Sequence, residues 1–175
     1  MDSAVAFRRV LPQEVPALVR LRLVTREETY RGVYPDEWID GFDFAASEER
    51  FGCMAADPDQ NLFFIEFDGE TAGYLCYGRE QETTMPENSI CINMLYLLRS
   101  FQRRGIGALA LEQVRGYCRS IRRDRFYNGC NLYNENAVHF YKKMGGRVIS
   151  WSTVAENKAK DQLVFEHLVP ARADE

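Results

Sequence analysis

The sequence predicts an α/β or mixed α+β protein in which helices cover one central sheet. Strand patterns and helix patterns alternate along the 175 residues, which is the order expected for such a sheet. No internal repeat and no Pro/Gly/Ser-rich linker divides the chain. The hydrophobic fraction of 46% and the charged fraction of 27% are typical of a folded globular protein, so extensive disorder is not expected.

The first elements are a strand and two helices. Val5–Val10 has a strand pattern, and Pro12 stands where a helix can start, because its missing N–H is not needed there. Apolar residues within Val15–Leu23 give the first helix a buried face. Tyr30–Pro35 ends that helix, and Phe44–Met54 forms the second.

A hairpin and a long strand follow. Leu62–Phe67 and Thr71–Tyr77 are strand patterns joined by Asp68-Gly69, a dipeptide typical of tight hairpin turns. Ser89–Leu98 has a nearly continuous apolar core, which indicates a central strand covered on both faces.

The last third of the chain alternates helix and strand. Gly105–Ile121 has helical apolar spacing, Phe126–Leu132 is a short strand, and Asn136–Met144 is a helix that Gly145-Gly146 ends. Two further strands are predicted at 147–154 and 162–169, before a frayed tail from Pro170.

Composition excludes several classes of protein. The net charge of −4 argues against a dedicated nucleic-acid binder. Five cysteines without Cys-x-x-Cys spacing, with two histidines, favour reduced buried thiols over disulfides or a metal site. Met94–Leu98 is far shorter than the ~20 apolar residues of a membrane helix. Met1–Ala4 lacks the basic start of a secretory signal, so we expect a cytoplasmic protein.

The most informative segment is the turn after the long strand. Arg103 and Arg104 precede Gly105 and Gly107 at the start of a helix, whose unpaired N–H groups and dipole favour an anion. The segment lacks the Gly-Lys-Ser/Thr of a Walker loop, and Ala110 breaks the dinucleotide fingerprint. The turn therefore binds phosphate or is an ordinary connection between strand and helix.

Two motifs resemble the GNAT superfamily of acetyl-CoA-dependent N-acetyltransferases. Residues 102–107, Gln-Arg-Arg-Gly-Ile-Gly, resemble its Gln/Arg-x-x-Gly-x-Gly/Ala motif, and 134–145 resembles its Asn-x-x-Ala-x-x-x-Tyr-x-x-x-Gly segment. The resemblance covers 61–168 well and the first 60 residues more loosely. It implies one GNAT domain over 1–175, with a mixed, mostly antiparallel sheet of six to seven strands and about four helices. Within the superfamily, three segments are most similar to bacterial polyamine (spermine/spermidine) acetyltransferases of the PaiA type: Leu62–Gly73, Ser100–Gly107 and Asn134–Gly145.

The resemblance also implies a role for individual residues. Tyr141 would be catalytic, protonating the departing thiolate; its alternative role is a core aromatic. Asn134 would contact the cofactor, cap the following helix, or do both. The side chains of 95–97 are expected in the core, with only their main chain functional. The residues expected to bind acetyl-CoA are Leu95, Tyr96, Leu97, Gln102, Arg103, Arg104, Gly105, Ile106, Gly107, Ala108 and Asn134.

The sequence does not identify the general base. Relatives carry a glutamate at one of two strand positions, which here hold Cys91, with Asn93 on the same face, and Gly129. The remaining candidates for the general base are a water chain and an acid such as Glu27 or Glu28. Both glutamates could equally be ordinary surface charges. His139 is expected at the surface because it diverges from Tyr141 around the helix. The arginine cluster at 115–125 is expected to be mostly solvated, with one member as a candidate for the 3′-phosphate of the cofactor.

The function implied is acetyl transfer from acetyl-CoA to a primary amine by direct attack, with a polyamine as one acceptor class. The N-terminal helices and residues 30–34 would shape the acceptor site. The alternatives are a non-catalytic acyl-CoA-binding regulatory module and a protein N-terminal or aminoglycoside acetyltransferase. A nucleic-acid-binding domain is the least favoured. A small-molecule or peptide amine is the expected partner, without metal, nucleic acid or membrane, and a homodimer is compatible with the resemblance.

Overall fold

The computed structural model describes residues 4–171, which form two compact units. The first unit comprises the described residues up to Tyr77 together with Met94–Leu109. The second comprises Gly78–Asn93 and the described residues from Ala110 onward. Most of the predicted tail, 172–175, and the start of the chain, 1–3, lie outside the described residues. Within them, no helix is long and apolar enough to cross a membrane.

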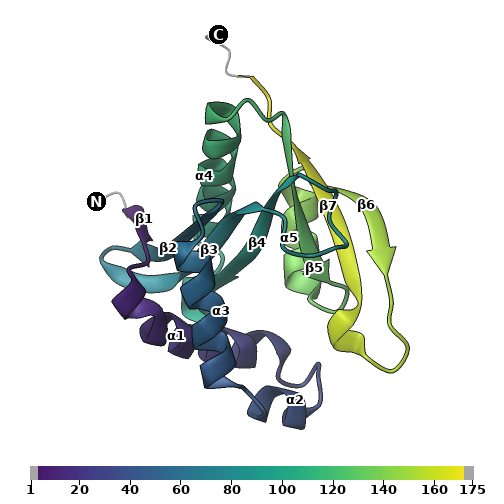
Figure 1. The fold of residues 1–175 in the computed structure, drawn as a ribbon. Helices are drawn as coiled ribbons and strands as arrows, with labels where there is room; N and C mark the ends of the chain where they lie inside the picture. The colour runs from purple at the N-terminus through teal and green to yellow at the C-terminus, as the bar shows by residue number, and fades with distance from the viewer. Residues whose placement is uncertain (1–3, 172–175) are drawn as a thin grey trace. The chain divides into compact units, whose positions relative to one another are not determined.

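The described residues contain seven strands in one mixed sheet, in the order β1-β2-β3-β4-β5-β7-β6. Strand β4 (Ile90–Leu97) runs parallel to β5 (Arg125–Asn131), whereas the pairs β1–β2, β5–β7 and β6–β7 are antiparallel. Five α-helices accompany the sheet (Figure 1). The predicted fold class is therefore confirmed.

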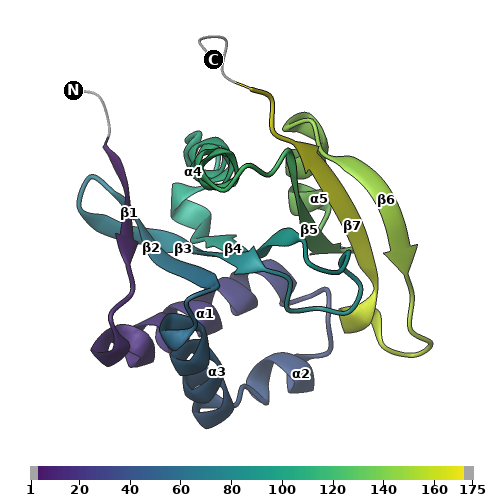
Figure 2. The same cartoon turned by 45° about the horizontal axis from the view of Figure 1, so that its top comes forward.

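In the first unit, β1 (Val5–Arg9) pairs with β2 (Gln60–Phe67), from Val5 opposite Phe67 to Arg9 opposite Phe63. The short helix Pro12–Glu14 leads into α1 (Val15–Tyr30), which lies beside α3 (Phe44–Ala56) (Figures 1 and 2). Asp43 caps α3 by accepting a hydrogen bond from the N–H of Ala46 at 2.9 Å. The described chain also contains α2 (Asp36–Asp40), which the sequence analysis missed, since five residues are too few to show a helical period.

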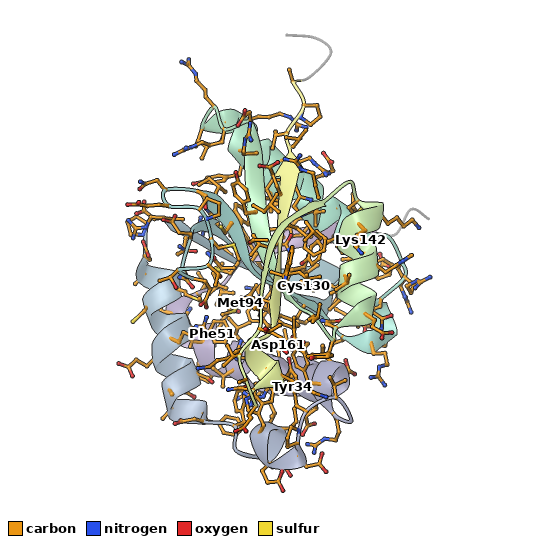
Figure 3. The ribbon with its side chains drawn as sticks, turned by 90° about the vertical axis from the view of Figure 1, so that its right-hand side faces the viewer. Tyr34, Phe51, Met94, Cys130, Lys142 and Asp161 are labelled. Atoms are coloured by element: carbon orange, nitrogen blue, oxygen red, sulfur yellow. The ribbon has the colours of Figure 1, made fainter. Side chains whose placement is uncertain are left out.

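The core of the first unit forms where α1 and α3 meet the strands. Leu18, Phe51, Leu62 and Tyr74 are buried together with Met94 of β4 (Figure 3 labels Phe51 and Met94). Burial of such side chains stabilises a fold by about 1.5–3 kcal/mol each.

Strands β3 (Glu70–Arg79) and β4 approach very closely at Gly73. A Cβ atom on Gly73 would lie 2.1 Å from the carbonyl oxygen of Tyr96 and 3.0 Å from the Cα of Leu97. Only glycine fits there, because the obstructing atoms belong to the main chain and cannot rotate away. Before it, Asp68 and Gly69 have φ of +50° and +86°, which confirms the tight turn expected between β2 and β3.

In the second unit, β5 and β6 (Arg147–Ser152) flank β7 (Gln162–Leu168) (Figure 2). Phe126 lies opposite His167, and Asn128 lies opposite Phe165. Pairing of β5 with β4 covers Cys91 opposite Tyr127 and Ile92 opposite Asn128. Helix α4 (Ile106–Ser120) begins in the first unit and continues in the second, which also holds α5 (Glu135–Lys143).

Candidate active site

The turn after β4 contains two residues in the left-handed region. The short helix Arg99–Phe101 follows β4, and α4 starts at Ile106. Between them Arg103 has φ of +63° and Gly105 has φ of +79°. Glycine adopts this conformation without the steric cost that a Cβ imposes, so Gly105 is present for a conformational reason. Gly107 lies in the first turn of α4 and does not have a positive φ.

Three hydrogen bonds and two cation–ring contacts within the first unit hold this turn. Gln102 donates from Nε2 to the carbonyl oxygen of Leu97 at 3.0 Å. The Oε2 atom of Glu28 accepts from the main-chain N–H of Arg99 at 2.7 Å, and the Arg99 guanidinium donates back to the carbonyl of Glu28. The guanidinium of Arg104 lies over the rings of Phe67 and Phe101, at 5.4 and 5.5 Å from their centroids.

These contacts give Glu28 and Gln102 defined structural tasks. Glu28 is more than the plain surface charge expected from the sequence, because it binds the N–H that begins the turn. Glu27, the other acid considered, forms an exposed ion pair with Arg31 at 3.2 Å. The side-chain amide of Gln102 ties the turn to the end of β4, and the first N–H groups of α4 have no acceptor within their own helix. The turn thus exposes two arginines, Arg103 and Arg104, beside the main-chain N–H groups at the start of α4.

Asn134 and Tyr141 lie in the second unit, and their local roles differ. The Oδ1 atom of Asn134 accepts from the N–H of Ala137 at 3.2 Å, which confirms the expected cap of α5. Tyr141 is 6% exposed, and its ring lies 5.5 Å from the ring of Phe165 and 5.8 Å from that of His167. Its ring is therefore part of the packed interior, as the alternative role required.

The two strand positions considered for a general base, Cys91 and Gly129, hold no acid. Cys91 is buried, its Sγ lies 3.2 Å from the Oγ of Ser89, and burial raises the pKa of its thiol to about 11. At Gly129 a Cβ would lie 2.9 Å from the Cε of Met85, so the segment before β4 occupies the space of a side chain. A carboxylate that the sequence analysis did not single out, Glu80, belongs to this same segment.

Two minor expectations are confirmed. His139 is exposed on α5. Arg122, Arg123 and Arg125 are exposed, whereas Arg115 packs over Phe126 and donates to the carbonyl of Met144 at 3.3 Å. Three of the five arginines are thus solvated, whereas Arg115 and Arg119 are partly buried, with 15% and 24% of their side chains exposed.

The comparisons with known proteins agree with this architecture. Residues 25–146 match the model of the acetyltransferase (GNAT) family. A protein of Lactobacillus delbrueckii subsp. lactis, described as an uncharacterized N-acetyltransferase in the pepI 3′ region, is 27% identical over 146 residues, covering 82% of this chain and 84% of its own.

Two solved structures have a similar fold. The PaiA N-acetyltransferase from Thermoplasma acidophilum in complex with coenzyme A superposes with a TM-score of 0.76 at 16% identity, covering 94% of this chain and 99% of its own. The yncA acetyltransferase from Salmonella typhimurium with acetyl-CoA superposes with a TM-score of 0.68 at 13% identity, covering 97% of this chain and 96% of its own.

The family match spans well over half of the chain, so this chain belongs to the acetyltransferase (GNAT) family. It is accordingly an acetyl-CoA-dependent N-acetyltransferase.

Proposed function

We propose that the protein transfers the acetyl group of acetyl-CoA to a primary amine by direct attack, within one functional domain formed by the whole chain. The observation that carries this proposal is the turn in which Arg103 and Gly105 adopt positive φ directly before α4. This turn aims unpaired N–H groups and two arginines at an anion, as binding of a pyrophosphate requires. The coenzyme A in the PaiA structure and the acetyl-CoA in the yncA structure support the same donor.

The cofactor is assigned to main-chain groups more than to side chains. In our proposal the N–H groups of 103–108 receive the pyrophosphate, and the main chain of 95–97 follows the pantetheine arm. An N–H near Leu97 polarises the thioester carbonyl, for which loss of one comparable donor costs about 10²–10³ in rate. The Oδ1 atom of Asn134 caps α5, so its amide group is the part assigned to the cofactor.

The reaction joins the amine nitrogen to the acetyl carbon and breaks the carbon–sulfur bond. An alkylammonium with a pKa near 10.4 must lose a proton before its nitrogen can attack. The departing thiolate then takes a proton from the hydroxyl of Tyr141, since a phenol is protonated at neutral pH. The packing of the Tyr141 ring against Phe165 and His167 supports this assignment, because it restricts where the hydroxyl can lie.

A polyamine is the acceptor class that we place first. The support is the similarity to the PaiA structure and the net negative charge of the chain, which favours a cationic substrate. If charge attraction guides this acceptor, the apparent KM for spermidine rises between low and moderate ionic strength, because salt screens exposed charges.

The test is release of the coenzyme A thiol by the purified protein with acetyl-CoA and a panel of amines. The panel contains spermidine, an aminoglycoside, free amino acids and peptides with free N-termini. Thiol release with any of them supports amine acetylation, and the preferred amine identifies the acceptor class. Tight binding of acetyl-CoA without release by any amine would instead indicate a non-catalytic acyl-CoA-binding module.

A further inference from the structure

The segment that joins β3 to β4 carries the most unusual carboxylate of the described chain. Residues 80–89 make this connection within the second unit, and the N–H of Glu80 donates to the carbonyl of Ser89 at 3.3 Å. The Oε1 atom of Glu80 accepts from the N–H of Asn88 at 2.7 Å. Its Oε2 atom is buried and has no hydrogen-bond partner among the described residues. A buried acceptor without a donor costs free energy, so this oxygen calls for a partner that the chain itself does not supply.

The segment 80–89 also lies on the face of the sheet that carries Cys91 and Gly129, the two positions where a general base was considered and no acid is present. Ser89, directly before β4, and Cys91 lie on the same side, as the 3.2 Å contact of their side chains shows, and Asn93 shares that side by alternation. The carboxylate of Glu80 lies close enough to Cys91 for its charge to help raise the pKa of that thiol. Met85 covers Gly129 on the neighbouring strand. The β3–β4 connection therefore fills the space of a side chain at Gly129 of β5, and it also places the carboxylate of Glu80 beside β4.

The sheet register places Tyr141 on the opposite face. Tyr141 contacts Phe165 and His167, which point to the same side of β7. Glu166 between them points to the other side, where its Oε2 accepts from the hydroxyl of Tyr127 at 3.2 Å. Cys91 pairs with Tyr127, so Cys91 and Tyr127 share that second side. The carboxylate beside Cys91 and the hydroxyl of Tyr141 thus belong to different sides of one sheet.

We infer that Glu80 is the proton acceptor for the acceptor amine, reached through a bridging water. This inference rests on the proposed amine acetylation. A water is proposed as the bridge because the buried Oε2 atom of Glu80 has no hydrogen-bond partner among the described residues. The ammonium gives one proton to the water, which passes one to Oε2 of Glu80, and the free nitrogen attacks the thioester carbon. The carbon–sulfur bond breaks, the thiolate takes the proton of Tyr141, and the second nitrogen proton passes through solvent to the tyrosinate. Glu80 then releases its proton to solvent.

Among the neighbouring ionisable groups, Glu80 is the best suited to accept the proton of the amine. They are Arg79 on β3, Cys91 on β4, Tyr127 on β5, Glu166 on β7 and Glu82 in the same connection. Glu166 is bound by Arg147, Arg125 and Tyr127, and the hydrogen bond from Arg147 lowers its pKa, so it is a weaker proton acceptor. Burial raises the pKa of Cys91 and of Tyr127, so both are protonated at neutral pH and neither can take the proton. The Arg79 side chain is a cation and is exposed, and Glu82 is exposed to solvent.

The test compares Glu80→Gln with Glu87→Gln, an exposed control in the same connection. The glutamine keeps an oxygen for the N–H of Asn88 but cannot accept the proton, so we expect kcat/KM near neutral pH to fall about tenfold or more. The deficit should shrink as the pH approaches the amine pKa of about 10.4, where free amine is abundant. Acetyl-CoA affinity and the Glu87→Gln rate should match the wild type.

Two results would overturn the inference. The first is a Glu80→Gln variant whose pH–rate profile equals that of the wild type. The second is a loss of rate that is the same at every pH and accompanies a lowered melting temperature, which indicates a structural role. If Glu80→Gln does not fold, Glu80→Ala is assayed with added formate, and restored turnover near neutral pH supports the inference while unchanged turnover opposes it. The wild-type rate tests the proposed function separately, because an inactive wild type refutes acetylation itself and the inference with it.

Discussion

The imidazole of His167 donates from Nε2 to the Oδ1 of Asn128 at 2.7 Å, deep between β7 and β5. The donor assignment follows from Asn128, whose Nδ2 donates to the carbonyl of Gly129 and so turns Oδ1 toward the ring. His167 is 1% exposed and stacks on Phe126 at 4.7 Å. Burial, reinforced by the charge of Arg115, lowers the pKa of His167 to about 4. The folded protein therefore holds this histidine neutral beneath Tyr141.

The neutral histidine makes the protein sensitive to acid. His167 has an ordinary pKa near 6.5 when unfolded and about 4 when folded, so the unfolded state binds the extra proton between these values. The stability that comes from burying His167 in its neutral form is complete above about pH 6.5 and is lost as the pH falls toward 4. At pH 5 the free energy of unfolding is lower by about 2 kcal/mol. We expect the melting temperature to fall by about 4–8 °C between pH 7 and pH 5. His167→Gln, which can still donate to Asn128, should show a flatter dependence. Identical pH dependence in both proteins would assign the effect to other groups.

Gly107→Val tests the anion-binding turn. The branched side chain should obstruct the approach of pyrophosphate oxygens to the first turn of α4, where Gly107 needs no unusual φ. We expect acetyl-CoA to bind about tenfold more weakly or worse, which is ~1.4 kcal/mol, with the fold retained. Calorimetric titration measures the affinity, and circular dichroism checks the fold. An unchanged Kd would falsify the assignment of this turn to the pyrophosphate.

Glu28→Ala separates a scaffold role from a catalytic one. The substitution removes the acceptor of the Arg99 N–H and should loosen the turn that precedes α4. A hydrogen bond to a charged group contributes about 1.5–3 kcal/mol, of which part should appear as a Kd for acetyl-CoA raised about three- to tenfold. Glu27→Ala, which removes only the exposed ion pair with Arg31, should leave the Kd unchanged. The opposite pattern, with a normal Kd and a pH–rate profile that loses its acidic limb, would make Glu28 a base.

Tyr141→Phe tests the proton donor while keeping the packed ring. The ring contacts with Phe165 and His167 remain, so we expect near-normal acetyl-CoA binding and a melting temperature close to that of the wild type. Turnover should fall about tenfold or more, below the ~10²–10⁴ of a fully effective acid because water can also protonate the thiolate. Steady-state kinetics with a verified acceptor gives the rate. Full activity would mean that another group supplies the proton, and a large loss of stability would mean that the hydroxyl has a structural role.

The sequence alone was sufficient for the positions of the strands and for most of the helices. It also located the turn at Gly105 and the cap at Asn134. These features depend on residues that are close together in the chain, because apolar periodicity, hairpin dipeptides and helix caps are local properties. Helix α2 was missed for the same reason, since its five residues are shorter than the pattern that reveals a helix.

Only the tertiary structure showed which distant residues meet. Glu28 binds the N–H of Arg99, which is 71 residues further along the chain. Gly73 of β3 faces the carbonyl of Tyr96 on the neighbouring strand β4. The buried Oε2 of Glu80 and the methyl group of Met85 above Gly129 depend on how the β3–β4 connection folds back on the sheet. Such contacts follow from strand register and side-chain packing, and no local sequence pattern encodes them because their partners are set by the whole sheet.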